Sequence, residues 1–280
     1  MPVFAADPFR ANTSTPVHEI GDLTENAFEA IFKRGDYQDA RQILAEAETA
    51  ESGEPLVHAM LASMAYLDND FTKVYDQALK TQSTASALKA SDPLRGHLYT
   101  AVGQFLQGAY VLKTEGVAKG TPAALGMLQQ VFSELDDAEE INPNDPELNL
   151  LKGYMDLMLA VNLPFSNPDQ AIARMSSYGS PTYLAQRGIA IGYRDLDQPD
   201  AALVAVDKAI AAAPNNPELL YLKAQILNRQ GNKTSSIDFF DQALTYSAQL
   251  PPALVTRMTW ERCVILPSAN TDACSRQAGY

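Results

Sequence analysis

The clearest pattern of apolar and polar positions lies between Tyr183 and Gln249, where the chain nearly repeats itself after about 34 residues. Small residues recur where two antiparallel helices would touch most closely, and larger apolar residues recur where they would fill the space between neighbouring pairs. The matched positions are Ala190 and Ala224, Tyr193 and Leu227, Ala202 and Ser236, Val206 and Phe240, and Ala209 and Ala243. The repeating unit is therefore predicted to be a helix pair that buries its apolar face only by stacking on the next pair.

Weaker versions of this pattern predict four further helix pairs nearer the amino terminus. Their ranges are 24–34 with 36–51, 55–67 with 71–90, 94–113 with 122–141, and 147–161 with 169–177. The first pair is degenerate, because bulky Phe28 occupies a position that the pattern keeps small. Two segments depart from the pattern, namely 94–121, with its long first helix and a glycine-containing turn at 115–121, and the enlarged turn at 162–168.

Two junctions between predicted pairs nearly repeat each other. One reads Asn-Pro-Asn-Asp-Pro at 142–146, and the other reads Ala-Pro-Asn-Asn-Pro at 213–217. Proline is favoured in the first turn of a helix, so each junction is predicted to precede a new pair. After the last pair, Ala253–Leu266 is predicted as a single amphipathic capping helix, because the end of a stacked array needs a polar outer face.

These features resemble the tetratricopeptide repeat (TPR), whose pattern ends in a proline that Pro214 matches and Ala248 does not. The resemblance covers 183–250 firmly and 21–90 and 122–177 more loosely. It implies an all-α fold, a right-handed α-solenoid of TPR-like helix-turn-helix pairs over residues 21–266 with a C-terminal capping helix. Residues 1–20 would form an extended lead-in, and residues 267–280 a C-terminal tail.

The resemblance also implies a binding surface, since the first helices of successive TPR units line a concave groove. The residues of this sequence at the groove positions of the last two pairs are Arg187, Ile191, Arg194, Tyr221, Gln225 and Asn228. Guanidinium groups beside amide and phenol groups would suit an extended peptide or a carboxylate ligand. In the alternative interpretation, Arg187 and Arg194 pair with local carboxylates such as Glu218 or Asp195 and contact no partner. The Asn and Lys set of chaperone-tail-binding repeats is absent.

Composition and motifs narrow the function. The 280-residue chain carries a net charge of -13, which argues against nucleic acid or an anionic membrane surface as partner. No apolar run is long enough for a transmembrane segment. No catalytic constellation is found, so the protein is predicted to be non-enzymatic and to need no cofactor.

Metal sites are not predicted either. The histidines His18, His58 and His97 are far apart, and none has a second ligand at i+3 or i+4, which argues against zinc. The segment 68–70 begins like a calcium loop but lacks the required glycine and glutamate. The acidic residues between Glu134 and Glu147 could bind a cation or a basic partner, although a solvated helix face is the favoured interpretation.

Two features bear on the cellular compartment. Val3 and Ala5 have the small-x-small form of a signal-peptidase site, so the first residues are predicted to be the remnant of a signal peptide. Cys263 and Cys274 could close a disulfide in an oxidising compartment. Both favour an exported protein, periplasmic or extracellular. A cytoplasmic protein with two free thiols is the alternative. A narrower resemblance of 144–165 and 4–10 to exported TPR proteins of cyanobacteria would support export.

Taken together, the sequence predicts a protein-interaction scaffold that binds an extended peptide or a partner protein in the groove, in the cell envelope. One alternative is a self-assembling structural element. Another is a small-molecule-binding or enzymatic helical protein with a pocket built by 94–121 and 162–168. The identity of the partner and the oligomeric state do not follow from the sequence.

Overall fold

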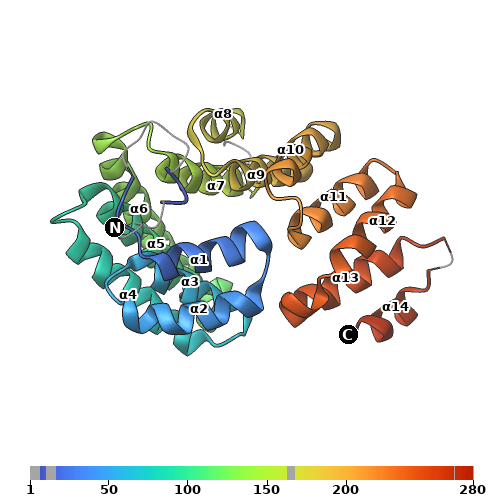
Figure 1. The fold of residues 1–280 in the computed structure, drawn as a ribbon, viewed down its shortest axis with the longest axis horizontal. Helices are drawn as coiled ribbons and strands as arrows, with labels where there is room; N and C mark the ends of the chain where they lie inside the picture. The colour runs from blue at the N-terminus through green and yellow to red at the C-terminus, as the bar shows by residue number, and fades with distance from the viewer. Residues whose placement is uncertain (1–6, 11–16, 163–167, 268, 280) are drawn as a thin grey trace. The chain divides into compact units, whose positions relative to one another are not determined.

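The structure is a computed structural model that describes residues 7–10, 17–162, 168–267 and 269–279. Every regular element within these residues is a helix, and successive helices run back and forth as pairs (Figure 1). The predicted fold class, an all-α solenoid, is confirmed. The proposed signal-peptide remnant and residues 163–167 of the enlarged turn lie outside the described residues.

The helices follow the chain in seven pairs over the described residues. The first four are α1 (Asp22–Phe28), continued by a π-helix (Glu29–Arg34), with α2 (Tyr37–Ala50); α3 (Pro55–Leu67) with α4 (Phe71–Leu88); α5 (Pro93–Glu115) with α6 (Val117–Ile141); and α7 (Pro146–Asn162) with α8 (Pro168–Tyr178). The last three are α9 (Thr182–Asp195) with α10 (Pro199–Ala212); α11 (Pro217–Arg229) with α12 (Lys233–Leu244); and α13 (Pro252–Val264) with α14 (Thr271–Ala278). A 3-10 turn, Ser247–Gln249, precedes α13.

The chain divides into two compact units. Unit 1 comprises Met1–Phe28 and Arg41–Leu148, and unit 2 comprises Glu29–Ala40 and Asn149–Tyr280. The predicted domain at 21–266 thus spans both units. Unit 2 is discontinuous in sequence, because it takes in the π-helix and the turn of the first helix pair.

The small residues of the 34-residue pattern are buried between helices, as the pattern predicts. Its alanines are buried without any solvent exposure at Ala190, Ala202, Ala209, Ala224 and Ala243. Ser236 stands in an alanine position and is equally buried, and its hydroxyl donates to the carbonyl of Ala224 at 2.7 Å. The buried hydroxyl of Ser236 therefore has a hydrogen-bond acceptor on the other helix of its own pair.

The degenerate first pair has a physical explanation. Phe28 is buried and its ring contacts that of Phe9 edge to face, with 4.8 Å between centroids. The large side chain thus packs against the segment that precedes the first helix rather than only against its own pair.

One predicted helix boundary was wrong. α6 begins at Val117 and not at Pro122, so the turn between α5 and α6 is the single residue Gly116, whose φ of 78° favours glycine. Pro122 lies inside α6, beyond its first turn, and has no N–H to donate to the carbonyl of Ala118, yet the helix continues to Ile141. The predicted tail also contains a helix, α14, whose amino end is capped by Asn270 through the backbone N–H of Ala273 at 2.9 Å.

Ionic groups occupy part of the interior of unit 1. The guanidinium of Arg10 is buried and binds both oxygens of Asp145, at 2.8 and 2.9 Å, together with Asp7 at 2.8 Å and Glu147 at 3.0 Å. Burial by itself lowers the pKa of Arg10, but the surrounding carboxylates outweigh burial and raise it. The solvated-face interpretation of the acidic run was wrong at Asp145 and Glu147, which are both fully buried.

A second buried arginine extends this cluster. Arg95 forms a two-pronged ion pair with Glu54, at 2.6 and 3.2 Å, and its Nε lies 3.7 Å from Glu147. Tyr99 donates its hydroxyl to Glu147. Burial raises the pKa of Glu147, because the charges of Arg10 and Arg95 only partly offset the loss of water.

Candidate functional site

A polar pocket opens on unit 2 where α9, α11 and α13 meet. Its volume is about 410 Å³. The residues that line it are Arg194, Asp195, Gln225, Asn228, Arg229, Phe240, Arg257, Trp260, Glu261, Val264 and Ile265. We call it the α9–α11–α13 pocket.

A chain of hydrogen bonds joins the three helices across the pocket. Arg194 on α9 donates to the side-chain oxygen of Gln225 on α11 at 2.6 Å. The amide nitrogen of Gln225 donates to Glu261 on α13 at 2.8 Å, and Arg257 donates to the other oxygen of Glu261 at 2.8 Å. An amide can accept on one side and donate on the other, so glutamine suits the middle position. The wall of the pocket is therefore cross-linked before any ligand arrives.

The pocket is locally more positive than the protein. Three guanidinium groups line it, against two carboxylates, whereas the whole chain carries a net charge of -13. Arg229 is held by the carbonyl of Arg194 at 2.6 Å, and Arg194 also binds Asp195 at 2.8 Å. The side chain of Arg257 is 64% exposed, so it is the most accessible of the three guanidinium groups.

Apolar side chains form the rest of the lining. Trp260 is the one tryptophan of the sequence, and it lies beside Val264 and Ile265 from the end of α13. Tyr221 is 8% exposed and its ring lies 5.7 Å from that of Phe240. Burial, followed by the charge of Glu261, raises the pKa of Tyr221 above its usual range.

Three of the six predicted groove residues line this pocket, namely Arg194, Gln225 and Asn228. Ile191 is half-buried on α9, and Tyr221 is buried against Phe240. The sixth, Arg187, is not among the lining residues of the pocket. Three of the five residues that α9 and α11 contribute to this pocket are therefore among the predicted groove residues.

Arg187 instead forms an ion pair within unit 2. Its Nη2 lies 2.6 Å from Glu218, and Tyr37 donates its hydroxyl to the other oxygen of Glu218 at 2.7 Å. The charge of Glu218 raises the pKa of Arg187. The structure agrees here with the alternative interpretation, in which the arginine pairs with a local carboxylate, and Arg194 likewise pairs with Asp195 at 2.8 and 3.0 Å.

Tyr37 belongs to a segment that is held by α11, by the cap residue before α11 and by the 3-10 turn before α13. Asn216 donates its side-chain amide to the carbonyl of Phe32 at 3.0 Å, and Gln249 donates to the carbonyl of Arg34 at 3.2 Å. Gly35 has a φ of 64°, and a Cβ there would lie 2.8 Å from the Cδ of Pro217. The close approach requires glycine at this turn.

The sequence prediction missed the α13 side of the pocket. It treated Ala253–Leu266 as a cap whose charged residues face outward, whereas Arg257 and Glu261 face α11. One signal was available, because Glu261 lies 36 residues after Gln225, close to the repeat spacing. α13 therefore acts as the first helix of a further pair.

Cys263 and Cys274 are joined by a disulfide, with 5.5 Å between their Cα atoms. This separation is ordinary for a disulfide. The bond ties α14 to the end of α13, next to Val264 and Ile265 in the wall of the pocket.

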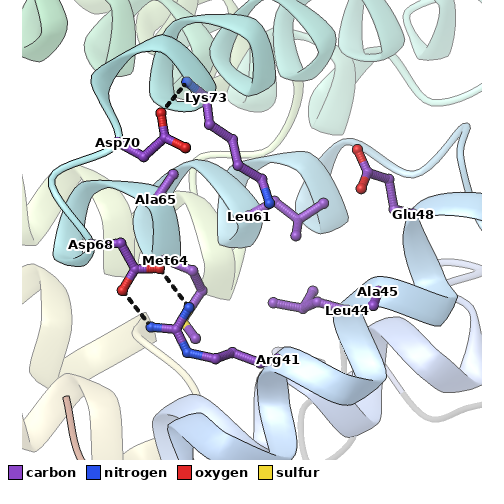
Figure 2. Close-up of a pocket in the computed structure, with 10 residues that line it drawn as sticks. All are labelled: Arg41, Leu44, Ala45, Glu48, Leu61, Met64, Ala65, Asp68, Asp70 and Lys73. Carbon is purple, nitrogen blue, oxygen red and sulfur yellow. Dashed lines mark hydrogen bonds and ion pairs between the residues drawn. The ribbon is translucent and has the colours of Figure 1, made fainter.

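A smaller pocket of about 240 Å³ lies on unit 1, among α2, α3 and α4 (Figure 2). Arg41 and Asp68 form a two-pronged ion pair across it, at 2.6 and 2.7 Å, and Asp70 caps α4 through the backbone N–H of Lys73. Both carboxylates of the segment that begins like a calcium loop are thus engaged within the protein. Arg41 and Asp68 satisfy each other, so this pocket is the weaker candidate for ligand binding.

The predicted irregular segment at 94–121 is not irregular. It consists of α5, Gly116 and the start of α6, both of which are continuous helices. This removes the main reason for placing a small-molecule or catalytic pocket there.

None of the helices in the described part of the chain combines the length and the hydrophobicity that crossing a membrane requires.

Residues 187–252 match the family model of the tetratricopeptide repeat. Among solved structures, that of PilW, described as a widely conserved type IV pilus biogenesis factor, is similar with a TM-score of 0.50 and 14% identity, over 80% of this chain and 90% of PilW. A TPR protein from Thermus thermophilus, TTC0263, aligns with a TM-score of 0.32 and 17% identity, over 86% of this chain and 98% of that one. No curated protein matches the chain significantly.

Neither match concerns the narrower resemblance to exported cyanobacterial proteins, which stays a prediction. The helix pairs, the buried alanine positions and the family match at 187–252 agree with one another. Residues 187–252 match the tetratricopeptide repeat and the described residues form an all-α solenoid of helix pairs, an architecture that implies a protein partner.

Proposed function

We propose that this protein is a non-enzymatic scaffold that binds an extended segment of a partner protein in the α9–α11–α13 pocket. The observation that carries the proposal is the hydrogen-bonded chain from Arg194 through Gln225 to Glu261, which crosses three helices and leaves a cavity beside it. A pre-formed wall lowers the cost of ordering side chains when a ligand binds.

The lining indicates which kind of segment fits. Exposed Arg257 and its neighbours Arg229 and Arg194 offer donors to carboxylates, either acidic side chains or a chain terminus. Trp260 and Val264 offer an apolar surface for one large side chain of the same segment. An acidic peptide with an apolar residue therefore fits the pocket.

We place the protein in the cell envelope. Three observations support this part of the proposal, namely the signal-peptidase-like residues Val3 and Ala5, the disulfide between Cys263 and Cys274, and the structural similarity to a pilus biogenesis factor. Fractionation of the native cells, with mass spectrometry of the mature amino terminus and of both thiols, tests the location. An intact leader with free thiols in the cytoplasmic fraction would refute it.

The pocket itself reports on binding, because Trp260 is the only tryptophan. Titration with acidic peptides that contain one apolar residue should change the tryptophan emission and saturate. The variant Arg257→Glu should weaken binding by about tenfold or more, since it reverses the most accessible charge of the pocket.

A matched control is Arg276→Glu, which makes the same charge change on the exposed surface of α14, outside the pocket lining. It should bind like the wild type. Equal loss in both variants would mean that binding follows overall charge and not the pocket. Capture of partners from envelope extracts with the wild type and Arg257→Glu extends the test to natural ligands. The same partners on both proteins would contradict the proposal.

A further inference from the structure

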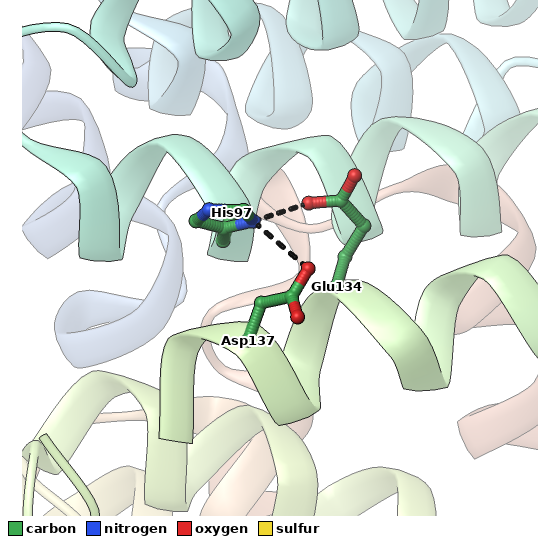
Figure 3. A group of neighbouring side chains, drawn as sticks. All are labelled: His97, Glu134 and Asp137. Atoms are coloured by element: carbon green, nitrogen blue, oxygen red, sulfur yellow. Dashed lines mark hydrogen bonds and ion pairs between the residues drawn. The ribbon is translucent and has the colours of Figure 1, made fainter. Parts of the chain in front are cut away.

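Three potential metal ligands meet between α5 and α6 of unit 1, although His97 lies far from Glu134 and Asp137 in the sequence (Figure 3). The Nδ1 atom of His97 lies 2.7 Å from Glu134 and 3.5 Å from Asp137. One ligand atom from each residue falls within 4.8 Å of the others. The sequence argued against zinc because His97 has no ligand on its own helix, and the second helix supplies both.

Helix geometry holds the two carboxylates together. Glu134 and Asp137 are three residues apart on α6, so they share one face of the helix. Their neighbours Leu135 and Ala138 are buried, as is Leu98 beside His97. The backbones that carry all three ligands are therefore fixed by apolar packing, which is the support that a metal site needs.

We propose that His97, Glu134 and Asp137 bind a divalent transition-metal ion, with Zn²⁺ as the ion that suits them best. An imidazole nitrogen with carboxylate oxygens is a ligand set that zinc uses, at roughly 2.0–2.2 Å from each atom. Tetrahedral ligands at that radius lie about 3.3 Å apart, and the observed separations of 2.7 and 3.5 Å bracket this value. Small side-chain movements thus suffice to admit the ion.

The charges around the site favour a cation. Lys89 donates to both oxygens of Glu134, at 3.0 and 2.7 Å, and so neutralises one of the two carboxylates. With a neutral imidazole, the group keeps one net negative charge. Lys89 can remain on one oxygen of Glu134 while the metal takes the oxygen that now accepts from His97. The side chain of Asp137 is 53% exposed, so water has access to the remaining coordination positions.

The imidazole of His97 also makes the site selective for Zn²⁺ over Mg²⁺ and Ca²⁺. Mg²⁺ and Ca²⁺ prefer sites made only of oxygen ligands, whereas Zn²⁺ and its neighbours bind imidazole well. A metal that joins α5 to α6 should stabilise this helix pair, because an ion that binds only the folded protein raises its melting temperature.

The test is calorimetric titration of chelator-treated wild-type protein with ZnCl₂, accompanied by thermal unfolding with and without zinc. We expect one site per chain and a rise in melting temperature that MgCl₂ and CaCl₂ do not cause. Co²⁺ should produce visible absorption bands, which report directly on ligands around the metal.

Variants decide whether the site is the one described. His97→Gln and Asp137→Asn should each weaken Zn²⁺ binding by at least about tenfold and abolish the Co²⁺ bands. Glu115→Gln removes a charge from an exposed position at the far end of α5 and should leave binding unchanged. Circular dichroism shows whether each variant folds. Wild-type affinity in folded His97→Gln, or weak binding at several sites only, would overturn the proposal.

Discussion

The two junctions that nearly repeat each other, 142–146 and 213–217, perform the same local task with different chemistry. Asp145 accepts the backbone N–H groups of Glu147 and Leu148, at 3.1 and 3.0 Å, and so caps α7. Asn216 accepts those of Glu218 and Leu219, at 2.9 and 3.3 Å, and caps α11. Aspartate and asparagine are equally good in this role.

The side chains of the two cap residues differ in the additional group that each one binds. The carboxylate of Asp145 holds the guanidinium of Arg10, whereas the amide of Asn216 donates to the carbonyl of Phe32. Each junction thus anchors a segment from near the amino terminus, one within unit 1 and the other within unit 2. The comparison shows that one residue in a repeated motif can keep its capping role while its charge selects the partner.

Removing the guanidinium group of Arg10 should have the largest effect on the free energy of unfolding. Arg10→Met leaves Asp7, Asp145 and Glu147 buried without their shared guanidinium. Loss of one partner of a buried ion pair costs about 3–5 kcal/mol of unfolding free energy. Urea denaturation measures it. Arg257→Met, which removes an exposed arginine, should cost less than about 1 kcal/mol. Similar losses of unfolding free energy in the two variants would show that a buried arginine contributes no more to stability than an exposed one.

Exchanging the cap residue in unit 1 should have a smaller effect. Asp145→Asn keeps an acceptor for the α7 backbone but loses the charge that binds Arg10 at 2.8 and 2.9 Å. Since Asp7 and Glu147 still hold Arg10, we expect a loss of about 1.5–3 kcal/mol, as for a hydrogen bond to a charged group. Thermal unfolding should then show a melting point between those of the wild type and Arg10→Met. Wild-type stability would mean that the charge at this junction is dispensable.

The buried carboxylate Glu147 should give unit 1 its own pH dependence. Burial raises the pKa of Glu147, so the folded protein holds a proton that the unfolded chain has already released. The free energy of unfolding therefore falls as the pH rises from the usual pKa of a glutamate to the raised pKa of Glu147. The fall is at most about 1.4 kcal/mol per pH unit. Glu147→Gln should remove this slope. Urea unfolding of both proteins from pH 4 to pH 8 gives the difference, and parallel curves would contradict the prediction.

The opposite substitution at the cap of α11 in unit 2, from asparagine to aspartate, should have the smallest effect on the free energy of unfolding. Asn216→Asp keeps the cap of α11 but loses the donor to the carbonyl of Phe32, which costs about 1 kcal/mol. Amide hydrogen exchange at Gly35 and Asp36 should accelerate, because the turn loses one of its anchors. Unchanged exchange there would show that Gln249 and Tyr37 hold the turn without Asn216.

The sequence predicts what depends on neighbours along the chain. Ala202, Ala209 and Ala243 occupy the buried positions that the 34-residue spacing predicts, because helix contacts within a pair are local. The resemblance to the tetratricopeptide repeat, and not the spacing alone, points to Arg194 and Gln225, which line the α9 and α11 side of the pocket.

What the sequence missed depends on partners from distant segments. Arg10 is buried by Asp145, 135 residues away, and no pattern near either residue indicates the pair. His97 gains its two possible ligands from another helix. The helix α14 was missed for another reason, since it is mostly polar and Cys274 is its one buried residue, so it shows no apolar periodicity.

The discontinuity of unit 2 bears on the order in which the protein is made. Tyr37 must find Glu218, 181 residues later, and the carbonyl of Phe32 must find Asn216, 184 residues later. At about 5–20 residues per second, the ribosome needs roughly 10–40 seconds to cover that stretch. During this time Glu29–Ala40 exists without its binding site on α11. Unit 2 can therefore be completed only after α11 has been synthesised, which makes its folding depend on contacts of high sequence separation.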